Sequence, residues 1–312
     1  MSWNKPGPWG GRDDGPGAPN ARWHNTIEAW QTGGGAGSTL LGFASDEGVR
    51  RNKGRTGART GPGALRAALA NIALQEPVKL SDAGDVSVAG TDLEAGQKEF
   101  ANVLAALLVD GQFTVGLGGG HEITFASYSG IAKALGSAGD WTLGCVNIDA
   151  HFDLRVADQA SSGTGFAQIA AAEAAAGRSF RYAAVGIAEA SNTKVLFDRA
   201  AELGVQVLLD TECHLGNLDG VQKFVADFAE SVDHLYLTID LDALPASVAP
   251  GVSAPAGFGI GLEVVRAIVV AAARSGKLMH ADIAELNPDF DLDQRTARTG
   301  ARLINDLIMN KG

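Results

Sequence analysis

Eight short apolar runs recur along the chain, and their length and β-branched content are typical of buried strands. Turn-forming or polar residues separate each run from the next. The predicted strands are Thr39–Ala44, Val78–Ala83, Phe113–Leu117, Thr142–Ile148, Tyr182–Ile187, Gln206–Leu209, His234–Ile239 and Leu278–Ile283.

Between these runs lie Ala- and Leu-rich segments whose apolar positions repeat with the period of a helix. The clearest are Pro62–Leu74, Leu93–Val109, Ile123–Leu135, Phe166–Ala176, Val221–Ser231, Leu262–Ser275 and Asp293–Met309. Alternating strands and helices favour parallel strands joined by right-handed crossovers, with helices on both faces. We therefore predict a single-domain, three-layer α/β/α fold over residues 38–312 with a mostly parallel eight-stranded sheet. Residues 1–37 are expected to form an irregular segment packed on this domain.

Polar side chains gather where several of these apolar runs end. Residues at i, i+2 and i+4 of an extended segment point the same way, so each group can direct its side chains to one point. The carboxyl ends of parallel strands lie on one edge of a sheet, where ligands bind. A carboxylate buried there needs a partner, and a metal ion is the obvious one. The residues concerned are His121, Asp149, His151, Asp153, Asp240, Asp242 and, after the last strand, Glu285.

The donor types indicate which ions would bind. Carboxylate oxygens with a minority of imidazole nitrogens suit Mn²⁺ better than a thiolate-rich zinc site. Two ions could share a water whose pKa falls from 15.7 towards about 7, which gives a hydroxide nucleophile. The alternative, in which the Asp residues cap turns and the His residues pack in the core, suits an isolated motif better than several at one sheet edge. The run Gly118–Gly120 is not followed by the Lys-Ser/Thr of a phosphate loop. The better interpretation is that these glycines let the backbone pass close to other segments and so bring His121 to the metal.

Composition limits the partners. The net charge of −11 argues against binding a phosphate backbone, and no apolar stretch is long enough to predict a membrane span. Two cysteines, Cys145 and Cys213, do not make a disulfide framework. The first twenty residues contain no apolar core of signal-peptide length. We expect a cytoplasmic protein that acts on a small molecule, with no nucleic-acid or membrane partner.

Four stretches between residues 118 and 288 resemble signatures of the ureohydrolase superfamily, the arginases and agmatinases. They read GGGHE, NIDAHFD, TIDLDALPASVAPGVSAP and DIAELNP. The resemblance implies an arginase-like fold, two Mn²⁺ ions and hydrolysis of C–N bonds in guanidinium or amidine groups, in a family that tends to form homo-oligomers. It implies that one or both ions are held by His121, Asp149, Asp153 and Asp242, with His151 and Asp240 completing the second coordination sphere. Asp149, Asp153 and Asp242 could then be bridging ligands, and Glu285 matches the carboxylate that holds the cationic N–C–N group.

One departure narrows the choice within the superfamily. Arginases and agmatinases carry a proton-shuttling His where this chain has Phe166. The loop 161–166 resembles the Ser-Gly-Thr-Pro-Phe pattern of formimidoylglutamases, although Gly165 replaces the usual Pro. Residues 43–62, FASDEGVRRNKGRTGARTGP, are very similar to the N-terminal signature of that subfamily. The resemblance thus covers nearly the whole chain and implies conversion of N-formimino-L-glutamate to L-glutamate and formamide in histidine degradation.

Such a substrate has a formamidine head and two carboxylates, so it needs one acidic and at least one basic contact. The resemblance suggests that Glu285 holds the amidinium and that Asp153 carries the proton to the departing nitrogen. Arg155 could bind carboxylate bidentately, with a salt bridge to a nearby helix as its alternative role. The cations of residues 50–55 could equally form surface or interface pairs. The further candidates for substrate contacts are Ser162, Asn192, Lys53 and Arg55.

Three other functions compete with this one. Another ureohydrolase would act on guanidinobutyrate, agmatine or arginine, but agmatine has no carboxylate for Arg155 to bind. A metal-dependent deacetylase would use one Zn²⁺ and an adjacent His pair, which the sequence lacks. A non-catalytic homologue would have lost a ligand, and all six positions are intact.

Overall fold

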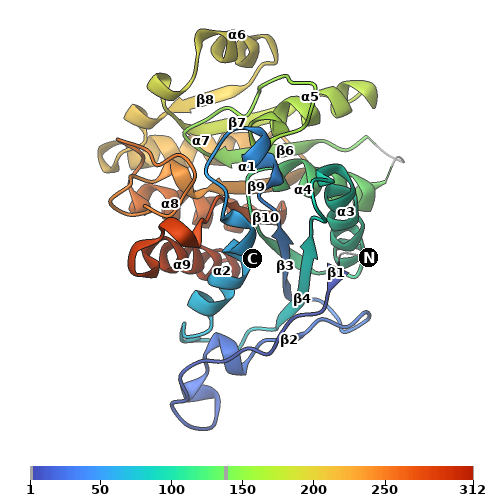
Figure 1. The fold of residues 1–312 in the computed structure, drawn as a ribbon, viewed down its shortest axis with the longest axis vertical. Coiled ribbons are helices and arrows are strands. Elements are labelled where there is room, and N and C mark those ends of the chain that lie inside the picture. Colours follow the sequence, from blue (N-terminus) through green and yellow to red (C-terminus); the bar gives the residue numbers. More distant parts are fainter. Residues whose placement is uncertain (1–2, 137–139, 312) are drawn as a thin grey trace.

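One sheet of ten strands forms the centre of the protein, and helices cover both of its faces (Figure 1). The computed structural model describes residues 3–136 and 140–311. The strand order is β1-β4-β3-β5-β10-β9-β6-β7-β8, with β2 also paired to β4. The pairings are parallel except that of β1 with β4. The strands are β1 (Trp3–Asn4), β2 (Glu28–Ala29), β3 (Ser38–Ala44), β4 (Leu80–Ser87), β5 (Phe113–Leu117), β6 (Leu143–Ile148), β7 (Arg181–Ile187), β8 (Gln206–Leu209), β9 (His234–Asp240) and β10 (Leu278–Ala284).

The helices lie in two layers, each over its own hydrophobic core. Successive residues of a strand point to opposite faces, so Leu40 of β3 packs in one core and Leu41 in the other. Helices α2, α7, α8 and α9 contribute to the first core, and α3, α4, α5 and α6 to the second. The helices are α1 (Glu47–Arg51), α2 (Gly61–Leu69), α3 (Leu93–Val109), α4 (Ile123–Leu135), α5 (Gly165–Ala175), α6 (Lys194–Glu202), α7 (Leu218–Glu230), α8 (Leu262–Arg274) and α9 (Arg295–Met309).

The predicted three-layer α/β/α fold is confirmed, and every predicted strand and helix is present within a few residues of its expected bounds. The structure adds α1 and α6, and it places two short strands, β1 and β2, in the segment expected to be irregular. The start of α9 is displaced because Asp293 and Gln294 both have a left-handed backbone with φ 55°. Within the described ranges, no helix is both long enough and apolar enough to cross a membrane.

The N-terminal segment is anchored by tryptophans. Trp23 is fully buried and its indole N–H donates to Asn305 Oδ1 of α9 at 2.9 Å. Trp9 stacks on Trp23 and donates to Asp82 Oδ2 of β4 at 2.9 Å. Because each indole N–H has a partner, these large side chains bury apolar area without leaving a buried donor unsatisfied.

The topology brings the candidate residues together. Strands β5, β10, β9 and β6 are consecutive neighbours in the middle of the sheet. Their registers place Ile283 beside Leu117 and Ile239, and Ile148 beside Ile239. The carboxyl ends of these four strands therefore lie at one level, and the segments that follow them meet at one edge.

The glycines before His121 pass between other backbone segments. Gly119 N donates to Phe43 O at 2.8 Å, and Gly120 N donates to Ser45 O at 2.9 Å. A Cβ atom on Gly119 would lie 1.8 Å from Ser45 O, which is a clash with backbone. Close backbone approach, the role predicted for this run, is therefore confirmed.

We predict that Gly119→Ala destabilises the fold by about 1–3 kcal/mol or more, because the backbone must move to admit the methyl group. Gly63 is an exposed position of α2 with no atom within 4 Å of an added Cβ, so it provides the matched control. Gly63→Ala should raise stability by about 0.5–1 kcal/mol through helix propensity. Urea unfolding of both variants measures the difference, and equal stability of Gly119→Ala and the parent protein would contradict the steric argument.

Candidate metal centre and substrate cavity

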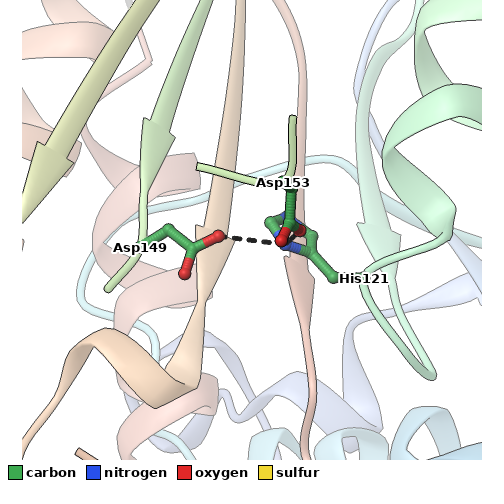
Figure 2. Close-up of side chains that lie close together, drawn as sticks. All are labelled: His121, Asp149 and Asp153. Carbon is green, nitrogen blue, oxygen red and sulfur yellow. Dashed lines mark ion pairs between the residues drawn. The ribbon is translucent and has the colours of Figure 1, made fainter. Parts of the chain in front are cut away.

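A cluster of carboxylates and imidazoles lies at the edge where β5, β6 and β9 end. The glycine run after β5 delivers His121, and the segment after β6 delivers Asp149, His151 and Asp153. Figure 2 shows Asp149 and Asp153 approaching the His121 ring from the segment that follows β6. Asp240 and Asp242, the other two predicted ligands, occupy the end of β9 and the short 3₁₀ turn after it.

His121 is the centre of one group. Its Nδ1 lies 2.9 Å from Asp153 Oδ2, 3.3 Å from Asp149 Oδ2 and 3.2 Å from Asp240 Oδ2. No hydrogen bond of acceptable geometry reaches this nitrogen from the described residues, although it is buried. The three oxygens thus converge on this nitrogen, and His121, Asp149 and Asp153 lie close enough together to hold one cation.

His151 is the centre of the second group. Its Nδ1 lies 3.4 Å from Asp149 Oδ1 and 3.2 Å from Asp242 Oδ2. Asp149 thus turns one oxygen to each imidazole, so two ions held here would share it. Asp240 thus lies beside His121 and Asp242 beside His151, and the division of these carboxylates between the two ions stays a prediction.

Local hydrogen bonds fix the orientation of these carboxylates. His151 N donates to Asp149 Oδ1 at 2.7 Å, and Asn147 Nδ2 donates to Asp149 Oδ2 at 3.0 Å. Asp242 N donates to Asp240 Oδ1 at 2.7 Å. In both cases the backbone N–H two residues later binds the carboxylate. The orientation of the carboxylate is therefore fixed before an ion binds, which reduces the entropy lost on binding.

The cluster carries more negative charge than its imidazoles can balance. Burial, followed by the charge of Asp242, raises the pKa of Asp240 well above its ordinary value, and burial with the charge of Asp149 raises that of Asp153. The charge of Asp242 raises the pKa of His151 to about 12. Burial opposes ionisation of Asp149, but hydrogen bonds from His121 and His151 outweigh it and lower the pKa of that carboxyl.

These residues fit a pair of divalent ions. Three buried carboxylates and the partly buried Asp153, with two imidazoles, remain net negative even if both rings are protonated. Asp242 Oδ1, like His121 Nδ1, is buried without a hydrogen-bond partner among the described residues. Hard oxygen donors with a minority of nitrogens match Mn²⁺.

A cavity of about 330 Å³ opens onto the cluster. The residues predicted from the sequence to contact substrate all line it, namely Lys53, Arg55, Arg155, Ser162, Asn192 and Glu285. An adjoining hollow of about 1000 Å³ shares Lys53 and Arg155 with it, so these two cations lie between the metal end and the outer hollow.

Glu285 lines the cavity, and one of its carboxyl oxygens is buried. Its Oε1 accepts a hydrogen bond from His121 N at 2.8 Å, whereas its Oε2 has no partner in the described part of the chain. Burial, followed by the charge of Glu122, raises the pKa of Glu285 to about 8. A cationic group entering the cavity would supply the missing partner and favour the ionised form.

Three cavity residues have a left-handed backbone that side chains rarely adopt. They are Lys53 (φ 63°), Asp153 (φ 49°) and Glu285 (φ 69°). Such conformations cost energy and persist where the surrounding structure holds them. Glu285, for example, is held by its backbone N–H, which donates to Gly119 O at 2.8 Å.

The cations of this region differ in what they bind. Arg50 pairs with Glu47, and Arg51 pairs with both Glu47 and Glu94. These two arginines therefore form ion pairs within the protein, the alternative role that the sequence left open for the cations of residues 50–55. The Arg55 guanidinium donates to two backbone carbonyls and lies 4.0 Å from the centre of the Phe290 ring.

Lys53 and Arg155 are exposed and are not engaged in the same way. Their side chains make no ion pair or hydrogen bond to any residue within 3–136 or 140–311. The salt bridge considered for Arg155 is therefore not found there. Both cations are available to an anionic group in the cavity.

Asn192 and Ser162 contact other residues of the cavity wall. The Asn192 amide accepts from Phe152 N at 3.1 Å and donates to Ala150 O at 2.8 Å, so it braces the segment that carries the ligands. Ser162 Oγ accepts from Asn52 Nδ2 at 3.2 Å. A direct substrate contact by either residue stays a prediction.

Phe166 does not reach the cavity. It is fully buried and stacks on Tyr182 with ring centroids 3.9 Å apart. Its edge faces the His121 ring at 6.4 Å between centroids. At this position the chain therefore places an apolar ring behind the ligand instead of a titratable group in the cavity.

Three polar residues near the centre were not identified from the sequence. Glu122 accepts hydrogen bonds from Ser45 Oγ at 2.7 Å and from Gly48 N of α1 at 2.9 Å. These bonds hold the start of α1 against the residue that follows His121. Thr238 and Asp282 lie inside β9 and β10, below His121. For Thr238 and Asp282 the available signal was a polar residue within an otherwise apolar strand.

The chain is similar to known proteins over nearly its full length. The model of the Arginase family matches residues 36–310. The formimidoylglutamase of Rhodococcus opacus is 50% identical over 307 residues, which cover 98% of this chain and 96% of that protein. The formimidoylglutamase of Chromobacterium violaceum is 47% identical, covering 95% of each chain.

Solved structures agree on the fold. The formimidoylglutamase of Bacillus subtilis superposes with a TM-score of 0.80 at 22% identity, covering 92% of this chain and 90% of that one. A crystal structure of Trypanosoma cruzi formiminoglutamase with Mn²⁺ gives a TM-score of 0.78 at 23% identity, covering 88% of this chain and 93% of that one.

The shared position of Asp149 leads to a prediction about metal content. Asp149→Asn removes the carboxylate that faces both imidazoles, so we expect the variant to retain neither ion after dialysis. Asp153 faces only His121, so Asp153→Asn should retain about one ion per chain. Elemental analysis of the dialysed proteins counts the ions, with exposed Asp198→Asn as the matched control. Equal metal content in the Asp149 and Asp153 variants would argue against a shared carboxylate.

Proposed function

This chain belongs to the arginase family, and we propose that it hydrolyses N-formimino-L-glutamate to L-glutamate and formamide with two Mn²⁺ ions. The observation that carries this assignment is the division of one cavity into an acidic end, at the cluster and Glu285, and a basic side with two unengaged cations, Lys53 and Arg155. Curated formimidoylglutamases that are about half identical over nearly the whole chain support the same substrate. The reaction would belong to histidine degradation.

The chemistry of the substrate matches this division. Its formamidinium head is cationic and planar, and the buried Oε2 of Glu285 can accept one of its N–H groups. The two carboxylates of its glutamate portion are anionic. Arg155 can bind a carboxylate through two parallel hydrogen bonds, whereas Lys53 offers a point charge. Binding at both ends would fix the reacting carbon between them.

Manganese would be held by the six residues of the cluster. His121, with Asp153 and Asp240, would hold one ion; His151, with Asp242, would hold the other; Asp149 would contact both. When bound, the pair of ions supplies a hydroxide nucleophile at neutral pH by lowering the pKa of a shared water towards about 7.

The side chains of the cavity would handle the proton. The C–N bond between the formimino carbon and the glutamate nitrogen breaks, and that nitrogen must gain a proton as it leaves. Asp153 lines the cavity, and its burial beside Asp149 raises its pKa, so Asp153 Oδ2 can take a proton from the attacking water and donate it to the nitrogen. Phe166 carries no titratable group and is excluded from this role.

The assignment is tested by turnover. The Mn²⁺-loaded protein should release formamide and glutamate from N-formimino-L-glutamate, and it should release little urea from arginine, agmatine or 4-guanidinobutyrate. Product analysis by mass spectrometry follows all four reactions in parallel. Urea from a guanidino substrate, without formamide from the formimino compound, would retain the metal chemistry and overturn the substrate.

The role of Arg155 is tested by Arg155→Gln, which removes a charged hydrogen-bond partner and keeps a long polar side chain. Loss of such a contact should lower kcat/KM by about 10- to 100-fold, mainly through KM. Arg50→Gln is the matched control, because Arg50 is paired with Glu47 and does not line the inner cavity. An equal effect of both substitutions would indicate long-range attraction of the substrate instead of direct contact.

A further inference from the structure

A chain of buried polar groups runs from the metal centre into the interior of the sheet. His121 Nε2 lies 2.9 Å from Thr238 Oγ1, and Thr238 Oγ1 lies 2.5 Å from Asp282 Oδ1. Asp282 Oδ2 accepts from Ser127 Oγ and from Tyr236 OH, both at 2.6 Å. These residues are buried, and Thr238 and Asp282 do not line the cavity. A buried polar chain of this kind requires a physical explanation, because each member costs free energy unless it is satisfied.

The strand register places the members side by side. Thr238 of β9 is the direct partner of Asp282 of β10, and Gly116 of β5 is its partner on the other side. A Cβ atom on Gly116 would lie 2.7 Å from Asp282 Cβ. A glycine at this position therefore leaves the space that the buried carboxylate occupies.

Asp282 accepts hydrogen bonds but has no lysine or arginine partner in the described ranges. No Lys or Arg within 3–136 or 140–311 forms an ion pair with it, and the nearest imidazole, His280 Nε2, lies 3.7 Å away. Burial opposes ionisation, but His280 and the hydroxyls of Ser127 and Thr238 outweigh it and hold the pKa of Asp282 below its ordinary value. An ionised carboxylate can only accept hydrogen bonds, so these hydroxyls must donate to it.

The direction of these hydrogen bonds determines the tautomer of His121. Because Thr238 gives its one hydroxyl proton to Asp282, its oxygen can only accept from the His121 ring. Nε2 must then carry a proton, and in the neutral ring the lone pair is left on Nδ1. Nδ1 is the atom that faces the three carboxylates of the first group.

We propose that Asp282, acting through Thr238, is a positioning residue that fixes the orientation and tautomer of His121 for metal binding. The chain Asp282–Thr238–His121 is a carboxylate–hydroxyl–imidazole relay, which extends the more direct carboxylate–imidazole support of metal-binding histidines. The inference rests on the proposed metal centre. It assigns the support to one of the two ions, because the ion-pair partners of His151 among the described residues are Asp149 and Asp242 and not Thr238 or Asp282.

Thr238→Val tests the proposal, because valine keeps the shape of the side chain and removes the hydroxyl. Metal-free protein is titrated with Mn²⁺, and the free ion is counted by its electron paramagnetic resonance signal. The affinity for one ion should fall by about 10- to 100-fold, whereas that for the other changes by less than about 3-fold. Thr238→Ser, which retains the hydroxyl, should restore binding. If the valine variant does not fold, Thr238→Ala is titrated in its place.

Tyr236→Phe is the matched control. It removes an equally short hydrogen bond to the same carboxylate, and Tyr236 forms no hydrogen bond with His121 in the described chain. It should leave both Mn²⁺ affinities within about 3-fold of the parent protein, since the relay to His121 is intact. Wild-type binding in Thr238→Val, or equal losses in Thr238→Val and Tyr236→Phe, would overturn the relay and leave the proposed function standing. A parent protein that binds no pair of Mn²⁺ ions would overturn the proposed function and the relay with it.

Discussion

The burial of three carboxylates, with a fourth partly buried beside them, at one edge of the sheet is the constraint on which the structure of the site depends. Isolated ionised groups cannot be removed from water without compensation. Here backbone N–H groups satisfy part of their hydrogen-bonding capacity, and two imidazoles supply part of the charge. Part of the negative charge is left unbalanced, and Asp242 and His121 each have a buried atom without a hydrogen-bond partner. Bound cations would satisfy both the charge and these atoms.

The sheet order is what makes this burial achievable. The strands that deliver the ligands and Glu285 are neighbours in space although β5 and β10 are far apart in sequence. Each crossing places a helix over one face, so the centre of the sheet is covered on both sides and only the strand ends stay accessible. The left-handed backbone at Asp153 and Glu285 lies at these ends, where dense backbone hydrogen bonding can hold it.

Much of this arrangement could be predicted from the sequence, because apolar runs and the polar residues that follow them are local patterns. The two-residue strands β1 and β2 could not, since they are too short to show periodicity and depend on pairing with β4. The distribution of Asp240 and Asp242 between the imidazoles depends on side-chain rotation at the end of β9, which i, i+2 spacing does not specify. Thr238 and Asp282 were missed because their contact depends on the register of two strands distant in sequence.

Specificity depends on the part of the cavity that the metal chemistry does not determine. In the proposed function, the metal ligands and Glu285 hold a planar N–C–N cation, and they would serve a guanidinium as well as a formamidinium. Discrimination must therefore come from the other end of the substrate, where Lys53 and Arg155 have no protein partner in the described chain and would remain unneutralised beside an uncharged or cationic tail. Phe166 is buried near His121 and does not line the cavity, so it cannot contact that tail, and under the proposed function its recognition would fall to the two cations.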